Sequence, residues 1–116
     1  MEKTMDNAFY RSKRWKLKRE KILKRDKYLC QYFSRYGKLV EAEHVHHIYP
    51  AEFYPEYALC DWNLISLSTK AHNLMHDRDT HELTAEGLKL QKRVQKFKEA
   101  YDAAHTPPPA GEIFIV

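Results

Sequence analysis

The sequence predicts a small single-domain α+β protein in which two short strands lead into a helix, a ββα unit. A basic helix precedes this unit and a longer helix follows it. Three observations carry the prediction: helical periodicity with caps at residues 13–25 and 85–103, candidate strands at 39–48 (with β-branched residues) and 62–67, and a capped helix at 69–77 directly after the second strand. The 116 residues are enough for one compact domain, and a hydrophobic fraction of 43% with 31% charged residues is typical of globular proteins.

The first helix is predicted at residues 13–25. Ser12 is a suitable N-cap, and Trp15, Ile22 and Leu23 form an apolar stripe. The remaining surface of this helix is cationic: residues 1–40 contain 13 Lys and Arg against 4 Asp and Glu, whereas the rest of the chain contains 7 against 12. This asymmetry favours a polyanionic partner, above all nucleic acid, although a solvated helix face would also explain a basic run.

Two short strands are predicted next, after a loop at residues 28–37. The first covers residues 39–48, where Val45 and Ile48 are β-branched, and the second covers residues 62–67. Two prolines interrupt the chain between them, and a short helical turn fits residues 55–59.

Two further helices are predicted after the second strand. The first covers residues 69–77, with Ser68 or Thr69 as N-cap, and the second covers residues 85–103, capped by Thr84. Apolar residues of the second helix recur at helical spacing and are expected in the core: Leu90, Val94, Phe97 and Tyr101.

Residues 106–116 are expected to form a Pro-rich extended tail after a single domain at 1–105. Its apolar end at 113–116 either packs back on the domain or adds to a sheet edge of a partner. Residues 1–15 lack the apolar core of a signal peptide, and no apolar run is long enough to span a membrane. We therefore expect a cytoplasmic protein without a membrane partner.

Histidines cluster around the predicted strands and the helix at 69–77. Histidine is the commonest metal ligand and a ready general base near neutral pH. His72 and His76 lie four positions apart on the predicted helix, so both imidazoles can reach one ion. His46 and His47 are adjacent on the predicted strand, so one can turn to a metal while the other faces a substrate. Asn63 could hydrogen-bond a histidine and set its orientation.

The order His46-His47, then Asn63, then His72 resembles the motif of the HNH endonucleases, which have a ββα-metal (His-Me finger) core. The additional His76 resembles the closing His-x-x-x-His of colicin-type DNases. The flanking segments are similar to the short HNH proteins of phages, and the resemblance covers residues 9–78. The matching segments are residues 9–15, 25–30, 45–50 and 62–67.

The resemblance implies hydrolysis of DNA phosphodiester bonds in a motif core at about 39–78, leaving a 5′-phosphate and a 3′-hydroxyl. His47 would be the general base, and Asn63 would orient His47 or support the metal loop. One divalent metal ion (Mg, Mn, Ni or Zn) would be held by His46 and His72, with His76 as a third ligand. An exchange of roles between His46 and His47 is an open alternative, as are a buried core histidine at position 47 and a simple turn residue at position 63.

Nucleic-acid binding is expected from basic residues that would contact backbone phosphates: Lys13, Arg14, Lys18, Arg19, Lys21, Arg25 and Arg78. For Arg78, charge complementation at a helix C-terminus is an equal explanation. His44 and His81 lie outside the motif and are expected to be surface residues.

One departure from the family pattern concerns structural zinc. Many phage-type relatives carry two C-x-x-C pairs that hold a zinc ion, and the corresponding positions here are Cys30 with Phe33 and Ser68 with Ala71. A single thiolate cannot supply the four ligands that a structural zinc needs. We therefore expect no structural zinc, and apolar packing by Tyr32, Phe33 and their neighbours in its place.

Three other functions are compatible with the sequence. The chain could be a non-catalytic nucleic-acid-binding HNH module, or a partner-dependent component of a phage packaging complex beside the terminase or other packaging proteins. It could also be an RNase, because a one-metal ββα site does not exclude RNA. The resemblance to phage proteins implies action in the cytoplasm of a bacterial host cell, with DNA as the main partner, and leaves the oligomeric state open.

Overall fold

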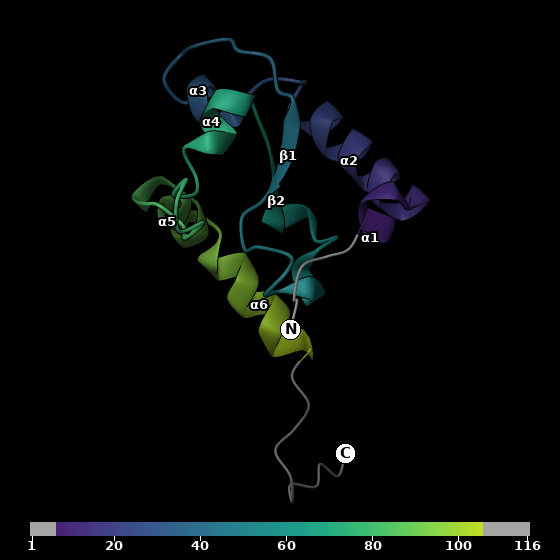
Figure 1. The fold of residues 1–116 in the computed structure, drawn as a ribbon. Helices are drawn as coiled ribbons and strands as arrows, with labels where there is room; N and C mark the ends of the chain where they lie inside the picture. Colours follow the sequence, from purple (N-terminus) through teal and green to yellow (C-terminus); the bar gives the residue numbers. More distant parts are fainter. Residues whose placement is uncertain (1–6, 106–116) are drawn as a thin grey trace, which may run out of the picture.

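Two antiparallel strands lie at the centre of the computed structural model, which describes residues 7–105 (Figure 1). β1 (His44–His47) pairs with β2 (Leu64–Leu67), so that His46 lies opposite Ile65 and His47 opposite Leu64. α1 and α2 lie on one side of the strands, and α4 and α5 lie on the other (Figure 1). The predicted α+β class with a ββα core is confirmed, although both strands are shorter than predicted.

α2 (Lys13–Arg25) has the bounds that the sequence predicted. The hydroxyl of Ser12 accepts a hydrogen bond from the N–H of Trp15 at 3.2 Å, as an N-cap should. A short helix that the sequence did not predict, α1 (Asn7–Arg11), precedes it. The Ser12 hydroxyl also donates to the carbonyl of Phe9 at 2.7 Å, so one residue joins the two helices.

Two apolar clusters hold α2 and the other helices to the strands. The cluster beside α2 consists of Trp15, Ile22 and Leu64, with Val45 packed against it. The larger cluster lies beside α4 and α5, and it contains Cys30 and Ala71, with Tyr32 and Phe33 packed against it. The apolar packing predicted in place of a structural zinc is therefore present.

The segment predicted as a loop at residues 28–37 includes a helical turn, α3 (Gln31–Ser34). The connection between the strands contains two 3-10 turns, η1 (Pro55–Tyr57) and η2 (Asp61–Asn63). η1 lies within the predicted helical turn at 55–59. η2 takes up the start of the predicted second strand, which is why β2 begins only at Leu64.

α4 (Thr69–Asn73) is shorter than the helix predicted at 69–77, because Leu74 is its C-cap. Ser68 is its N-cap, and the Ser68 hydroxyl accepts the N–H of Ala71 at 3.2 Å. His76 therefore lies beyond the helix, where it forms an isolated antiparallel bridge with Leu83. The prediction that His72 and His76 share one helix is wrong.

The helix predicted at 85–103 is divided into α5 (Ala85–Arg93) and α6 (Gln95–His105). Val94 interrupts it with φ −103° and ψ 8°. Leu90 is buried in the larger cluster, with Val94 and Tyr101 packed against it. Phe97 is 55% exposed, so its predicted place in the core is wrong.

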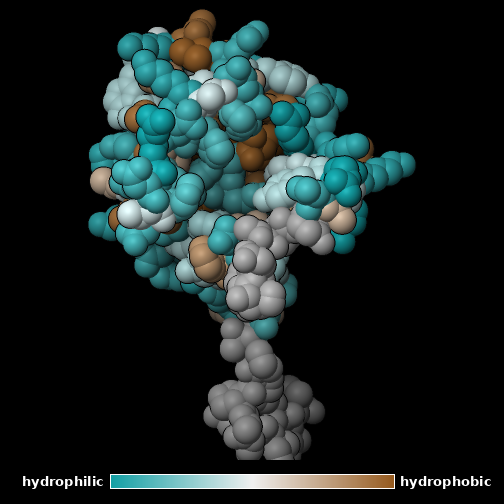
Figure 2. All heavy atoms as spheres, viewed as in Figure 1, coloured by the Kyte–Doolittle hydropathy of each residue, from teal (hydrophilic) through white to brown (hydrophobic). Residues whose placement is uncertain are grey.

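The face of the molecule shown in Figure 2 is predominantly hydrophilic, with scattered hydrophobic side chains. None of the helices that the structure describes is both long enough and apolar enough to cross a membrane. The predicted Pro-rich tail at 106–116 lies outside the described residues.

Candidate metal and catalytic centre

β1 directs its two adjacent histidines to different neighbours, as alternation along a strand requires. The ring centroid of His46 lies 5.2 Å from that of His72 and 5.8 Å from that of His76. The ring of His47 instead stacks on Trp15 of α2, with 5.1 Å between centroids and 24° between planes. The structure therefore brings the three predicted metal ligands together and sets the predicted base apart from them.

Two of the predicted metal ligands have buried nitrogens that lack a hydrogen-bond partner. These are Nε2 of His46 and Nε2 of His76, each without a partner among residues 7–105. Buried polar atoms are nearly always paired, so an unpaired one indicates a missing ligand or water. Burial, followed by the nearby His72 and His76, lowers the pKa of His46 to about 3. His46 is therefore neutral at physiological pH, as a metal ligand must be.

The imidazoles fit a divalent cation by their chemistry, although they do not yet converge on one point. Within residues 7–105, no three His, Cys, Asp or Glu side chains are already arranged to hold a metal ion. The two buried unpaired nitrogens of His46 and His76 still indicate a missing ligand, because a buried nitrogen without a partner costs free energy. Neutral imidazoles suit Zn²⁺, Ni²⁺, Cu²⁺ or Fe²⁺ better than Mg²⁺.

A hydrogen bond to the backbone determines which ring nitrogen of His47 carries the proton. Its Nε2 lies 3.0 Å from the carbonyl oxygen of Ala58, and a carbonyl can only accept. Nε2 therefore carries the proton, and Nδ1 keeps a free lone pair. Burial lowers the pKa of His47, with the bond to Ala58 acting in the opposite direction. A neutral imidazole with a defined basic nitrogen is what a general base requires.

Asn63 acts on the loop after β1 and makes no hydrogen bond to His47. Its Oδ1 accepts the N–H of Tyr49 at 2.7 Å, and its Nδ2 donates to the carbonyls of Tyr49 and Tyr57 at 3.1 and 3.2 Å. The backbone carbonyl of Asn63 accepts the N–H of Ile48 at 2.8 Å. Of the two roles that the resemblance implies for Asn63, these contacts favour a positioning role in the loop over orientation of His47.

A cavity of about 330 Å³ at the end of β1 joins these groups, lined among others by His46, His47, His72 and His76. Tyr10 and Glu52 also line it, and the sequence did not single out either residue. Two adjoining cavities share His76 with it, one of about 570 Å³ and one of about 870 Å³. The candidate centre thus opens into a longer path.

His44, which was predicted to be a surface residue, lies beside the candidate centre. Its ring stacks on His72, with 4.8 Å between centroids and 25° between planes. Its Nε2 lies 2.9 Å from the hydroxyl oxygen of Thr69. His44 therefore restricts the orientation of His72. The available signal was strand alternation, which puts His44 on the same side of β1 as His46.

Four of the predicted DNA-binding residues on α2 also make contacts within the protein. Lys18 and Lys21 form ion pairs with Asp61 at 2.5 and 2.9 Å. Arg25 donates to the carbonyls of Asp61 and Leu64, and Arg19 donates to the carbonyl of Glu43. These contacts join α2 to η2, to β2 and to the residue before β1, so these side chains also have a role in the fold.

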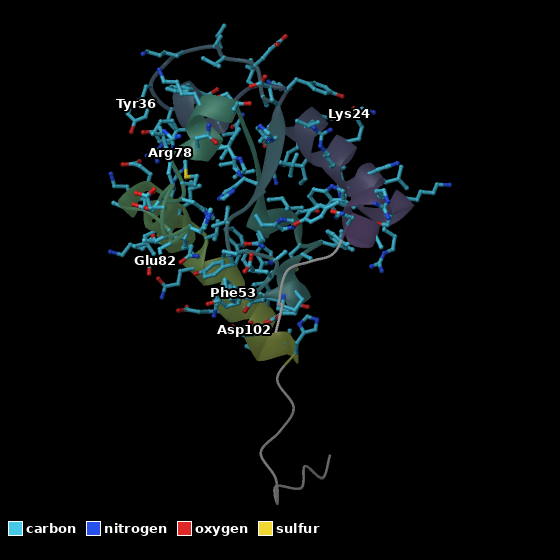
Figure 3. All side chains as sticks on the ribbon, in the orientation of Figure 1. Lys24, Tyr36, Phe53, Arg78, Glu82 and Asp102 are labelled. Carbon is cyan, nitrogen blue, oxygen red and sulfur yellow. The ribbon has the colours of Figure 1, made fainter. Side chains whose placement is uncertain are left out.

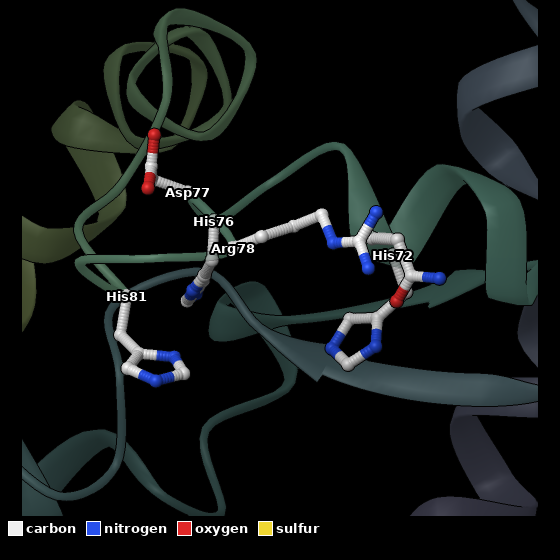
Figure 4. A pocket seen from close by; sticks show the side chains of 6 residues that line it. His72, His76, Asp77, Arg78 and His81 are labelled. Atoms are coloured by element: carbon white, nitrogen blue, oxygen red, sulfur yellow. The ribbon is translucent and has the colours of Figure 1, made fainter.

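Lys13 and Arg14 are different, because both are exposed and neither forms an ion pair among residues 7–105. Arg78 is also exposed and lines the cavity of about 570 Å³, together with His72, His76 and His81. Figure 4 shows its side chain extended toward the helix that carries His72. Since α4 ends at Asn73, Arg78 does not lie in a helical last turn, and charge complementation there does not explain it.

No protein-family model matches the chain, and no curated protein matches it. Among solved structures, the chain is similar to the HNH endonuclease of the deep-sea thermophilic bacteriophage GVE2, whose crystal structure was determined with a manganese ion. The two are 29% identical, with a TM-score of 0.56, over 81% of this chain and 83% of that one. Together with the His46-His47, Asn63 and His72 pattern on a ββα core, this likeness shows that the chain has the HNH endonuclease fold.

Proposed function

We propose that this chain is a divalent-metal-dependent endonuclease that hydrolyses phosphodiester bonds of DNA. The observation that carries the proposal is the cavity at the end of β1. It is lined by a neutral histidine of defined tautomer, His47, and by the imidazoles of His46, His72 and His76. A base and a set of metal ligands around one cavity are the groups that metal-assisted hydrolysis needs.

His47 is the proton acceptor in this proposal. Nδ1 takes a proton from a water molecule as that water attacks phosphorus, while Nε2 remains bonded to the carbonyl of Ala58. The charge that develops on the ring is delocalised over both nitrogens, and the bond to the carbonyl strengthens as it forms. Trp15 holds the ring plane by stacking, so the lone pair keeps one direction. Such preorganisation lowers the cost of orienting the base in the transition state.

His46, His72 and His76 would hold the metal ion. A divalent cation at this place would neutralise charge on the scissile phosphate and stabilise the leaving oxygen. Manganese in the similar phage enzyme supports a divalent ion here. His44 stacks on His72, and so contributes to the orientation of one ligand.

The DNA backbone would be bound by the basic residues that the fold leaves free. Lys13, Arg14 and Arg78 are exposed, and Arg78 lies beside the metal ligands. Contacts with phosphates give affinity that falls steeply with salt and depends little on sequence. We expect the protein to act in the cytoplasm of a bacterial host cell, since the similar protein is a phage enzyme.

The test is cleavage of supercoiled plasmid by the wild type and His47→Ala, each with EDTA and with Mg²⁺, Mn²⁺, Ni²⁺ or Zn²⁺ restored. We expect metal-dependent nicking or linearisation, reduced by roughly a hundred- to ten-thousand-fold in the variant. Calorimetric titration should show that His47→Ala still binds metal. His105→Ala is the matched control, because this exposed histidine of α6 lies outside the cavities around the centre.

Absence of cleavage with every metal, with DNA binding retained, would refute the nuclease proposal. It would favour a non-catalytic DNA-binding module, or a component of a packaging complex that needs a terminase or another packaging protein. Structured RNA in a parallel reaction tests the substrate class, since faster cleavage of RNA than of DNA would identify an RNase.

A further inference from the structure

The cavity of about 870 Å³ differs chemically from the rest of the path around the candidate centre. It shares His76, Pro50 and Glu52 with the cavity that contains His47, so the two cavities adjoin at these residues. No lysine or arginine is among the residues that line it. A phosphate in this cavity would have no lysine or arginine to pair with, and would therefore be poorly held there.

Aromatic side chains form one wall of this cavity. Phe53 and Tyr54 both line it, and Phe53 is 64% exposed. A single exposed phenylalanine on a protein surface needs no explanation. Phe53 is notable because it faces a cavity that adjoins the predicted base and metal ligands, where an exposed ring offers a flat face for stacking. Figure 3 shows Phe53 and Glu82 near each other, with Lys24 on the far side of the strands.

Two carboxylates supply hydrogen-bond acceptors in the same cavity. Glu52 and Glu82 both line it, and neither carboxylate forms a hydrogen bond or ion pair with another described residue. Carboxylates repel phosphate, but they accept hydrogen bonds from exocyclic amino groups such as N4 of cytosine. Stacking surfaces combined with acceptors suit a nucleobase, not the backbone.

His81 borders this cavity and the neighbouring one that contains Arg78. Its φ is +64°, a conformation that non-glycine residues seldom adopt, and its N–H donates to the carbonyl of Asp77 at 2.9 Å. Figure 4 shows its imidazole on the side of His76 opposite to the guanidinium of Arg78. The turn at 77–83 thus presents a further flat ring where the two cavities meet, with the cation of Arg78 on one side.

We propose that the cavity lined by Phe53, Glu52 and Glu82 receives an unpaired nucleobase next to the scissile phosphate. This inference rests on the proposed nuclease function and names its preferred substrate, DNA with a bulged, mismatched or single-stranded nucleotide at the cut. A base that is paired in a duplex is stacked inside the helix and cannot enter such a pocket without being extruded. Unpaired nucleotides require the least free energy to do so, which is the source of the preference.

The experiment measures binding of fluorescent DNA by anisotropy, with EDTA present to prevent cleavage. The probes are a short perfect duplex and the same duplex with one unpaired cytosine. We expect wild type to bind the bulged duplex more tightly, by about 5- to 100-fold if one base stacks on an aromatic side chain. Phe53→Ala should lose this preference and Phe53→Tyr should keep it. Phe97→Ala, at an exposed phenylalanine outside the cavity, is the matched control and should also keep it.

Equal binding of both duplexes by wild type, or an undiminished preference in Phe53→Ala, would overturn the proposal. Replacing the unpaired cytosine with thymine, which exchanges the exocyclic amino group for an N3–H donor, should weaken binding. Equal affinity for both would overturn recognition of the amino group by Glu52 and Glu82. Plasmid cleavage separates this inference from the proposed function. Cleavage without a preference for the bulge refutes the base pocket alone, and a preference without cleavage refutes the nuclease alone.

Discussion

Replacing Asn63 with alanine removes an amide that connects three backbone groups of the loop after β1. The side chain of Asn63 is fully buried. It accepts from the N–H of Tyr49 at 2.7 Å and donates to the carbonyls of Tyr49 and Tyr57 at 3.1 and 3.2 Å. Alanine at this position leaves these three groups without partners, in a place that water reaches poorly.

The expected loss follows from the number of these bonds. Each contributes about 1 kcal/mol net to folding, and a buried group left unpaired costs about 1–3 kcal/mol. Local relaxation will restore part of this, so we expect Asn63→Ala to lower the free energy of unfolding by about 3–6 kcal/mol. This is a large part of the roughly 5–15 kcal/mol that stabilises a typical domain. Asn63→Asp should destabilise as well, because it sets a carboxylate against two carbonyl oxygens.

Urea unfolding followed by tryptophan fluorescence measures this change, because Trp15 is buried and Trp62 packs against the larger cluster. Asn73→Ala is the matched control. Asn73 is exposed at the end of α4, and its side chain makes no hydrogen bond with another described residue. Its replacement should change stability by less than about 0.5 kcal/mol.

A loss of less than about 1 kcal/mol in Asn63→Ala, accompanied by a hundred-fold drop in plasmid cleavage, would refute the reasoning. Asn63 would then act on the reacting groups and would be catalytic. The positioning role requires that stability and activity decline together.

Three further predictions concern the histidines and the arginines. In metal-free protein, His46 binds a proton near pH 6.5 when unfolded but only near pH 3 when folded. The urea concentration at the midpoint of unfolding should therefore fall as the pH drops from 6.5 to 3. A midpoint that does not change with pH would contradict this prediction. His44→Ala should weaken metal affinity, measured by calorimetry, several-fold, whereas His44→Phe should retain the affinity because a phenyl ring can still stack on His72. Equal losses of affinity in both variants would instead make His44 a metal ligand. Arg25→Ala should lower the free energy of unfolding by about 1–2 kcal/mol, because its hydrogen bonds to two backbone carbonyls are lost. Arg14→Ala should leave the melting temperature unchanged and weaken the salt-dependent binding of DNA. Loss of DNA binding in Arg25→Ala but not in Arg14→Ala would mean that α2 binds DNA through the side that carries Arg25.

The parts of the fold that follow from local chemistry could be predicted from the sequence. α2 begins and ends where Ser12 and its apolar stripe indicated, because a cap and helical periodicity are properties of neighbouring residues. The order of strands and helices around the motif was also predictable. The ends of the strands were not, because η2 holds Asn63 where its amide can bond the backbone of Tyr49 and Tyr57, which lie 14 and 6 residues before it. Those hydrogen bonds do not show in the local pattern of the second strand.

His76 shows how tertiary contacts replace a local pattern. Helical spacing predicted that it would join His72, but α4 ends three residues before it. His76 reaches the centre because the chain doubles back: Thr84 donates its N–H to the carbonyl of Met75 at 2.9 Å and its hydroxyl to the carbonyl of Leu74 at 2.6 Å. A Cβ at Gly87 would lie 2.7 Å from the Met75 carbonyl oxygen, so the close approach of α5 depends on glycine. None of these contacts is visible in the spacing of the two histidines.

The different surroundings of His46 and His47 depend on the register of two short strands. His46 lies opposite Ile65 and turns toward His72 and His76, whereas His47 turns toward Trp15. The exchange of roles between these two histidines is disfavoured by their contacts. Nε2 of His47 is committed to a carbonyl, and that of His46 is buried without a partner. A shift of one residue in β1 would turn both histidines to the opposite faces of the sheet, His47 toward His72 and His76 and His46 toward α2. Adjacent histidines on a paired strand therefore acquire different chemistry from the side of the sheet that each one faces.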